Sequence, residues 1–125
     1  MNDYGLLLCD DLIFTSRIVG EAKALGLPVR AAKIVGDVLK LARQTPPRCV
    51  MIDLNTPGLL IDDLVRELTT LTPKPTIVGY GSHVDTATLK KARDAGCDVV
   101  WPRSKFVEEL EAALPVWFKA VETTS

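Results

Sequence analysis

The chain is poor in the residues that bind soft metals or close disulfides. It has one histidine, His83, and three cysteines, none of them in a C-x-x-C pair. Structural zinc sites draw their ligands mainly from Cys and His, so these counts argue against such a site. An odd number of cysteines in apolar surroundings is typical of reduced, buried thiols. We therefore expect a reducing compartment and place the protein in the cytoplasm.

Long hydrophobic runs and blocks of positive charge are also absent. No apolar stretch approaches the ~20 residues of a membrane span. The N-terminal segment carries an acid where a signal peptide would be positive. The 15 basic and 16 acidic residues give a formal net charge of −1 and form no Lys/Arg cluster. We expect neither a membrane nor a nucleic acid among the partners.

The 125 residues suit one domain with one core. Hydrophobic residues make up 47% and charged residues 25%, both ordinary for a globular protein. No linker, internal repeat or low-complexity segment interrupts the chain. We expect a single domain over residues 1–125, with residues 121–125 frayed and no output domain in the chain.

Short apolar runs alternate with segments of helical periodicity along the whole chain. The five runs of strand length span residues 6–9, 29–32, 49–52, 76–80 and 98–101. Strands that are apolar throughout predict a parallel sheet covered by helices on both faces. With right-handed crossovers the expected fold is α/β, a flavodoxin-like (βα)5 sheet of order 2-1-3-4-5.

Local signals place several helix ends. Gly26 and Gly96 stand where a helix ends in a left-handed residue. Ser104 is predicted to cap the start of the last helix. Pro115 lies inside that helix and is predicted to kink or split it.

Carboxylates gather where the first and third strands are predicted to end. Asp10 and Asp11 follow the first strand, Asp53 ends the third, and Asn55 comes two residues later. In this fold ligands bind beyond the carboxyl ends of these neighbouring strands. Mg²⁺, which takes carboxylate, carbonyl and water oxygens, would offset the mutual repulsion of the acids. The simpler alternative is that the acids only cap helices at strand–helix junctions.

Two basic residues, Arg103 and Lys105, follow the fifth strand. Either one would offset more of the negative charge at the same edge of the sheet. A carboxylate beside Mg²⁺ and a basic side chain suits phosphoryl transfer to the carboxylate, which acts as the nucleophile.

Three segments resemble the receiver domain of two-component response regulators (the CheY-like domains). They are LLLCDDLIFTSRIVG at 6–20, CVMIDLNTPG at 49–58 and KKARDAGCDVVWPRSKF at 90–106. The resemblance implies that Asp53 is the phosphoacceptor. It also implies that Asp10 and Asp11 form the acidic pair, with Asp11 the direct Mg²⁺ ligand, and that the Asn55 carbonyl is a further ligand.

The resemblance implies a signalling domain rather than an enzyme. Its expected activity is Mg²⁺-dependent acceptance of a phosphoryl group from a histidine kinase or phosphotransfer protein, followed by slow autohydrolysis. A downstream protein would bind the face made by helix 4, strand 5 and helix 5, where the family commonly signals.

The chain departs from the family pattern at two positions. The family carries Thr or Ser at the end of strand 4. When this chain is matched to the family pattern forward from Pro75, Tyr80 stands at that position. When it is matched backward from Gly96, Gly81 stands there. The family ends strand 5 with Lys-Pro, whereas counting from Gly96 places Arg103 at the lysine position.

Two other interpretations follow from these departures. The first is a pseudo-receiver, a protein-binding module that keeps the acids but no longer switches on phosphorylation. The second is a small flavodoxin-like enzyme or cofactor binder, which would need a phosphate-binding loop. The Gly-Tyr-Gly-Ser stretch at 79–82 lacks the third glycine of a dinucleotide fingerprint and follows the wrong strand.

Overall fold

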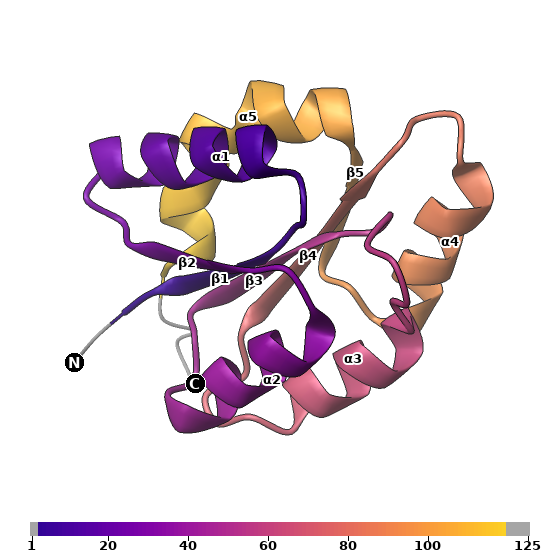
Figure 1. The fold of residues 1–125 in the computed structure, drawn as a ribbon, viewed down its shortest axis with the longest axis horizontal. Coiled ribbons are helices and arrows are strands. Elements are labelled where there is room, and N and C mark those ends of the chain that lie inside the picture. Colours follow the sequence, from indigo (N-terminus) through magenta and orange to yellow (C-terminus); the bar gives the residue numbers. More distant parts are fainter. Residues whose placement is uncertain (1–2, 120–125) are drawn as a thin grey trace, which may run out of the picture.

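The computed structural model describes residues 3–119, which alternate strictly between strand and helix (Figure 1). The elements are β1 (Gly5–Leu8), α1 (Leu12–Ala24), β2 (Val29–Ala32), α2 (Val35–Gln44), β3 (Cys49–Asp53), α3 (Ile61–Thr69), β4 (Thr76–Gly81), α4 (Thr86–Ala95), β5 (Val99–Pro102) and α5 (Arg103–Trp117). Every predicted strand is present, displaced by at most one residue at either end. The fraying predicted for residues 121–125 falls outside the described residues.

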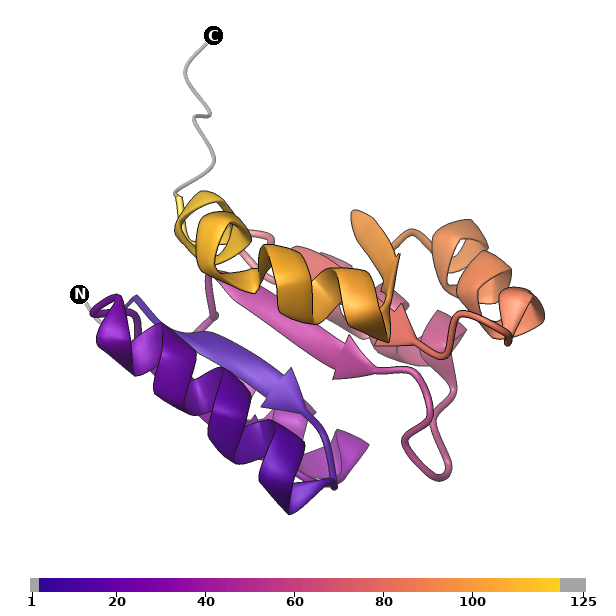
Figure 2. The same cartoon turned by 90° about the horizontal axis from the view of Figure 1, so that it is seen from above.

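The strands form one parallel sheet of order β2-β1-β3-β4-β5, which confirms the predicted topology. Helices α1 and α5 cover one face, and α2, α3 and α4 cover the other (Figures 1 and 2). All five strands run in the same direction, so their carboxyl ends and the loops that follow them share one edge. That edge is called the carboxyl edge below.

Each face of the sheet carries its own apolar cluster, because successive strand side chains point to opposite faces. Leu6, Leu8, Val50 and Ile52 pack with residues of α2, α3 and α4. Leu7, Cys9, Met51, Val78 and Tyr80 pack with residues of α1 and α5. Burial on both faces explains why the central strands are apolar at every position.

The helix-end predictions had mixed outcomes. Gly96 ends α4 with φ of 108° and Gly26 follows α1 with φ of 76°, both in the left-handed region. The Ser104 prediction was wrong: Pro102 is the cap residue of α5, and no side chain caps this helix. Proline suits this position because its fixed φ, here −59°, leads the chain from β5 directly into the helix.

Pro115 does not split α5, which continues to Trp117. Proline removes one N–H from the helix ladder, so the carbonyl four residues earlier loses its donor. That carbonyl belongs to Glu111, an exposed residue, so water can take the place of the missing donor. The amide of Phe118 still donates to the carbonyl of Leu114 at 3.0 Å and closes the last turn.

None of the helices within residues 3–119 combines the length and the apolar character needed to cross a bilayer.

Candidate functional site at the carboxyl edge

Asp53 is the last residue of β3, and its side chain is only 6% exposed. Its Oδ1 accepts a hydrogen bond from the Asn55 amide at 2.9 Å, and its carbonyl accepts one from the Thr56 hydroxyl at 2.7 Å. These bonds form a turn that takes the chain out of the sheet, as Asp commonly does. The other oxygen, Oδ2, is left to face the neighbouring elements.

Two groups approach Oδ2 of Asp53 from different elements. The Cys9 thiol, directly after β1, lies 3.8 Å away, and Nη2 of Arg103, at the start of α5, lies 3.9 Å away. The Arg103 guanidinium also covers the ring of Phe14 on α1, at 5.5 Å from its centroid. The sheet therefore brings the predicted acceptor and one of the two predicted cations together.

Lys105 is placed differently from Arg103. Its Nζ lies 5.3 Å from the centroid of the Trp101 ring. The described part of the chain contains no ion pair between Lys105 and Asp53. Of the two predicted cations, Arg103 is therefore the one that lies beside Asp53.

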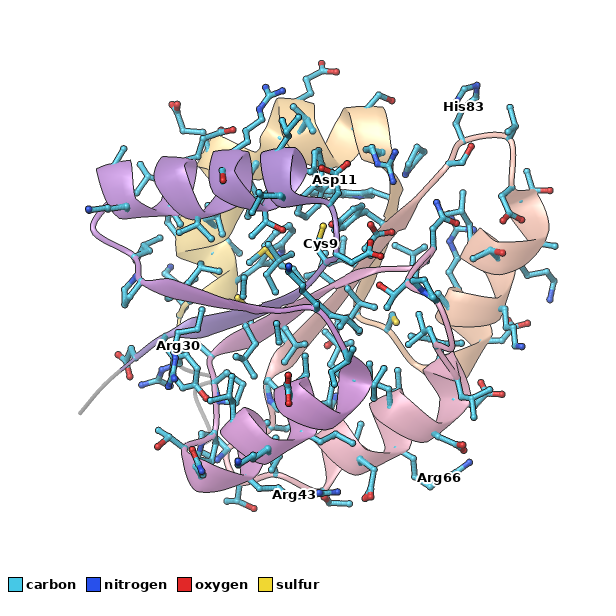
Figure 3. The ribbon with its side chains drawn as sticks, in the orientation of Figure 1. Cys9, Asp11, Arg30, Arg43, Arg66 and His83 are labelled. Carbon is cyan, nitrogen blue, oxygen red and sulfur yellow. The ribbon has the colours of Figure 1, made fainter. Side chains whose placement is uncertain are left out.

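The acidic pair after β1 is exposed, and one member has a structural role. Oδ1 of Asp11 accepts the amide of Phe14 at 3.0 Å, which makes Asp11 the N-cap of α1. Figure 3 shows Asp11 next to Cys9, where β1 leads into α1. Within residues 3–119, no three acidic, His or Cys side chains are grouped closely enough to hold a metal. The predicted ligands Asp10, Asp11, Asp53 and Asn55 thus stand at one edge without forming a ready metal centre.

Tyr80 pairs in register with Asp53 across the β3–β4 ladder. Its side chain is fully buried on the α1/α5 face, with its ring stacked on Phe106 at a centroid distance of 4.4 Å. Burial raises the pKa of the Tyr80 hydroxyl, and the Cys9 thiol and Asp53 carboxylate raise it further, while Arg103 acts in the opposite direction. The aromatic residue therefore belongs to the site as well as to the core.

The glycines on either side of Tyr80 make room for Leu54 on the opposite face. A Cβ placed on Gly79 would lie 3.2 Å from Cδ2 of Leu54, and one on Gly81 would lie 3.5 Å from its Cβ. Leu54 directly follows Asp53 and is itself buried. The Gly-Tyr-Gly sequence thus lets Tyr80 fill the α1/α5 face of the sheet while the two glycines leave space for Leu54 on the opposite face.

Sequence reasoning missed a set of exposed apolar side chains around this edge. They lie in the loops after β1 to β4 or in the first turn of the following helix, and are called the apolar rim below: Leu12, Ile13, Ile34, Leu60 and Val84. Their signal in the sequence is an apolar residue directly after a strand and its turn. Val116, near the end of α5, is a further large apolar residue that is exposed.

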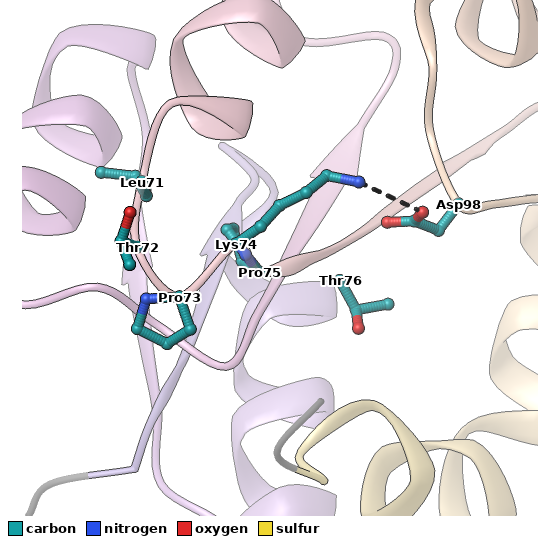
Figure 4. Close-up of a pocket in the computed structure, with 7 residues that line it drawn as sticks. All are labelled: Leu71, Thr72, Pro73, Lys74, Pro75, Thr76 and Asp98. Atoms are coloured by element: carbon teal, nitrogen blue, oxygen red, sulfur yellow. Dashed lines mark ion pairs between the residues drawn. The ribbon is translucent and has the colours of Figure 1, made fainter. Parts of the chain in front are cut away.

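Two other parts of the molecule are candidates for a functional site, the loop with His83 and a pocket at the far edge of the sheet. His83 points outward from the loop before α4 (Figure 3). A pocket of about 600 Å³ lies at the opposite edge of the sheet, lined by residues 71–76 and Asp98 (Figure 4). Its charged groups are Lys74 and Asp98, which pair with each other at 3.8 Å. This pocket contains none of the predicted site residues.

Comparisons with solved structures agree with this fold. A response regulator signal receiver domain from Bermanella marisrubri superposes with a TM-score of 0.81 at 21% identity, over 95% of this chain and all of that one. The receiver domain of the sensor histidine kinase PA1611 from Pseudomonas aeruginosa gives 0.79 at 17% identity, over 96% of this chain and all of that one. The chain has the fold of a response regulator receiver domain.

The sequence comparisons are weaker. No protein-family model matches the chain. The transcriptional activator protein ExaE from Pseudomonas putida is 28% identical over 96 residues, which are 74% of this chain and 44% of that protein. The chain thus matches less than half the length of this relative. The structure of the PA1611 receiver domain holds a magnesium ion in its active-site cleft.

Two residues that depart from the receiver pattern have defined neighbours in the structure. Tyr80, rather than Gly81, is the β4 residue in register with Asp53. Arg103, rather than Lys105, lies beside Asp53. The peptide between Trp101 and Pro102 is trans, since the cis peptide within the described residues joins Thr72 to Pro73.

Proposed function

We propose that the chain acts as a receiver in two-component signal transduction, with Asp53 as the phosphoacceptor. The observation that carries this proposal is the 3.9 Å approach of Arg103 to the Oδ2 atom of Asp53 at the carboxyl edge. Ligands bind at this edge, near the strand-order reversal, in doubly wound folds. A buried carboxylate with one oxygen held by the chain and the other facing a cation suits a nucleophile for phosphoryl groups.

The proposed transfer uses groups of this chain in defined roles. Oδ2 of Asp53 attacks phosphorus of a phosphohistidine, and the P–N bond breaks with its electron pair returning to the imidazole. Oδ1 stays fixed by the Asn55 amide, which orients the carboxylate. Arg103 offsets the charge of the phosphoryl oxygens. In the later hydrolysis, water attacks phosphorus, the bond between phosphorus and Oδ2 of Asp53 breaks with its electron pair returning to the carboxylate, and inorganic phosphate is released.

Mg²⁺ is part of this proposal, because the donor types at the edge suit it. Asp53, Asp11 and the Asn55 carbonyl would hold the ion, with Asp10 beside them, and all offer oxygen ligands. Oδ2 of Asp53 accepts no strong hydrogen bond, its contacts being a thiol at 3.8 Å and Arg103 at 3.9 Å. Asp11 would have to leave its capping bond to Phe14. When bound, Mg²⁺ supplies positive charge to the transferring phosphoryl group.

The proposed donor is a histidine kinase or a phosphotransfer protein, which would approach over the apolar rim because the rim lies at the same edge of the sheet as Asp53. A downstream protein would bind the face of α4, β5 and α5. The protein is proposed to work in the cytoplasm as a signalling domain without an enzymatic turnover of its own.

Two observations favour a second candidate function, a phosphorylation-independent pseudo-receiver that binds proteins. The carboxylates within the described residues are not grouped as a metal centre, and Asp11 is committed to capping α1. In such a protein the apolar rim would be the working surface, and Asp53 would only hold the turn after β3.

Phosphorylation by a small-molecule donor separates the two candidates. We would incubate wild type and Asp53→Asn with acetyl phosphate and Mg²⁺ and measure intact masses. The receiver proposal predicts one added phosphoryl group on wild type and none on Asp53→Asn. An unmodified wild type, or equal modification of the variant, would support the pseudo-receiver instead.

A further inference from the structure

Phe14, in the first turn of α1, is the aromatic residue that contacts the cation of the site. The Cζ atom of Arg103 lies 5.5 Å from the centroid of the Phe14 ring, within the range of a cation–π interaction. Arg103 begins α5, so this contact links α5 to α1 next to the carboxyl edge. A residue with no charge of its own is therefore a direct neighbour of the group that faces Asp53.

The contact between Arg103 and Asp53 is too loose to hold the guanidinium in place by itself. Nη2 of Arg103 lies 3.9 Å from Oδ2 of Asp53, which is too long for a hydrogen bond. Arg103 is 46% exposed, so water also screens the two charges. The face of the Phe14 ring is the second surface that limits where this long side chain can lie.

The Phe14 ring is itself held by other aromatic rings. Its centroid lies 5.3 Å from that of Tyr80 on β4 and 6.3 Å from that of Phe106 on α5. Tyr80 and Phe106 are fully buried and stack on each other. Phe14 is half-buried, so its ring lies between this aromatic core and the site. The ring thus offers Arg103 a fixed surface.

We propose that Phe14 is a positioning residue, whose ring holds the Arg103 guanidinium beside Asp53 and leaves its N–H groups free for phosphoryl oxygens. A guanidinium interacts with an aromatic face through its delocalised charge, so this contact uses none of its five N–H donors. The inference rests on the proposed function, because it assigns a partner to Arg103 in the same site.

A double-mutant cycle between Phe14 and Arg103 tests this role. We would measure the rate of phosphorylation by acetyl phosphate and Mg²⁺, from intact masses, for Phe14→Leu in the wild-type and Arg103→Gln backgrounds. In wild type, Phe14→Leu should slow phosphorylation about two- to five-fold, as expected for a partly exposed cation–π contact. In Arg103→Gln it should cause no further loss. Phe14→Tyr, which keeps an aromatic face, should retain the wild-type rate.

The second cation–π pair of α5 provides a matched control. Nζ of Lys105 lies 5.3 Å from the centroid of the Trp101 ring, a distance close to that of the Arg103–Phe14 pair. Trp101→Leu removes this contact without touching the pair beside Asp53. It should therefore leave the phosphorylation rate unchanged.

The ¹H–¹⁵N resonance of Arg103 Nε reports the contact without any phosphorylation. The ring current of Phe14 should displace it in wild type and in Phe14→Tyr, and Phe14→Leu should move it toward the position of a solvent-exposed arginine. The inference is overturned if Phe14→Leu leaves this resonance or the rate unchanged, or if it slows phosphorylation equally in both backgrounds, as lost packing would. Failure of the proposed function has a different signature: wild type is not phosphorylated, although the Arg103 resonance still responds to Phe14→Leu.

Discussion

The guanidinium of Arg103 lies 3.9 Å from Oδ2 of Asp53 and also covers the ring of Phe14. This arrangement joins the start of α5 to the end of β3 and to α1. Arg103 is 46% exposed while Asp53 is 6% exposed, so water screens the pair from one side. An exposed partner limits its contribution to stability, whereas its position suits a group that meets an incoming anion.

Replacing Arg103 should therefore affect phosphorylation more than folding. We expect Arg103→Gln to lower the yield of phosphorylated protein from acetyl phosphate several-fold, and Arg103→Lys to keep part of it. The free energy of unfolding should change by less than about 1 kcal/mol in both variants. Arg17→Gln is the matched control, because Arg17 pairs with Glu21 on the exposed face of α1. Equal yields in Arg103→Gln and Arg17→Gln would contradict this role.

Asp11 offers a way to separate capping from metal binding. Asp11→Ser keeps an N-cap for the Phe14 amide but removes the carboxylate, whereas Asp11→Ala removes both. We expect Asp11→Ser to retain wild-type stability and Asp11→Ala to lose about 1 kcal/mol in urea unfolding. Mg²⁺ affinity, measured by calorimetry, should fall in both. Unchanged Mg²⁺ binding in Asp11→Ser would show that Asp11 only caps the helix.

Gly79 is predicted to be required by packing. Gly79→Ala would place a Cβ 3.2 Å from Leu54, a contact that this buried side chain must relieve by shifting. We expect a loss of about 1 to 3 kcal/mol in the free energy of unfolding. Gly20→Ala is the control: Gly20 lies on α1 with nothing within 4 Å of the added Cβ, so the helix should gain roughly 0.5 to 1 kcal/mol. Similar effects of both substitutions in urea unfolding would be inconsistent with this packing.

Alkaline pH should destabilise the protein through its buried thiols. Burial raises the pKa of Cys49 from 9.0 to about 12. Above pH 9 the thiol ionises in the unfolded chain but not in the folded one, so the unfolded state binds fewer protons and gains stability. The folded protein should lose about 1 kcal/mol or more per pH unit from pH 9 toward pH 12.

Urea unfolding at about pH 8 and about pH 10.5 measures this loss. Cys49→Ala should show a shallower decline, although it is less stable at pH 8 because a buried sulfur is removed. Cys97, with its pKa raised to about 11 by burial and by Asp98, contributes in the same direction. A wild-type stability that stays level over this interval would rule out the proposed ionisation difference.

The strands and their order were predictable because burial on both faces of a parallel sheet leaves long apolar runs such as Val50 to Ile52. Asp53 was predictable for the same reason, since a carboxylate that ends such a run stands out. The register that sets Tyr80 opposite Asp53 was not, because two ways of counting gave two different residues.

Other features depend on spatial relationships that one sequence does not contain. Asp11 suits both a helix cap and a metal ligand, and only the position of the Phe14 amide shows which role it fills here. The burial of the Tyr80 hydroxyl among α1 and α5 likewise depends on the three-dimensional packing. The apolar rim consists of ordinary apolar residues, and their exposure depends on how the loops leave the sheet.

The most direct test of the account is whether a phosphoryl mimic binds at Asp53 and alters the carboxyl edge. We would record ¹H–¹⁵N NMR spectra of wild type and Asp53→Ala with Mg²⁺, before and after adding beryllofluoride. We expect beryllofluoride to shift the resonances of Asp53, Tyr80 and Arg103 in wild type and to leave Asp53→Ala unchanged. A wild-type spectrum that beryllofluoride leaves unchanged, or one that responds equally in Asp53→Ala, would contradict it.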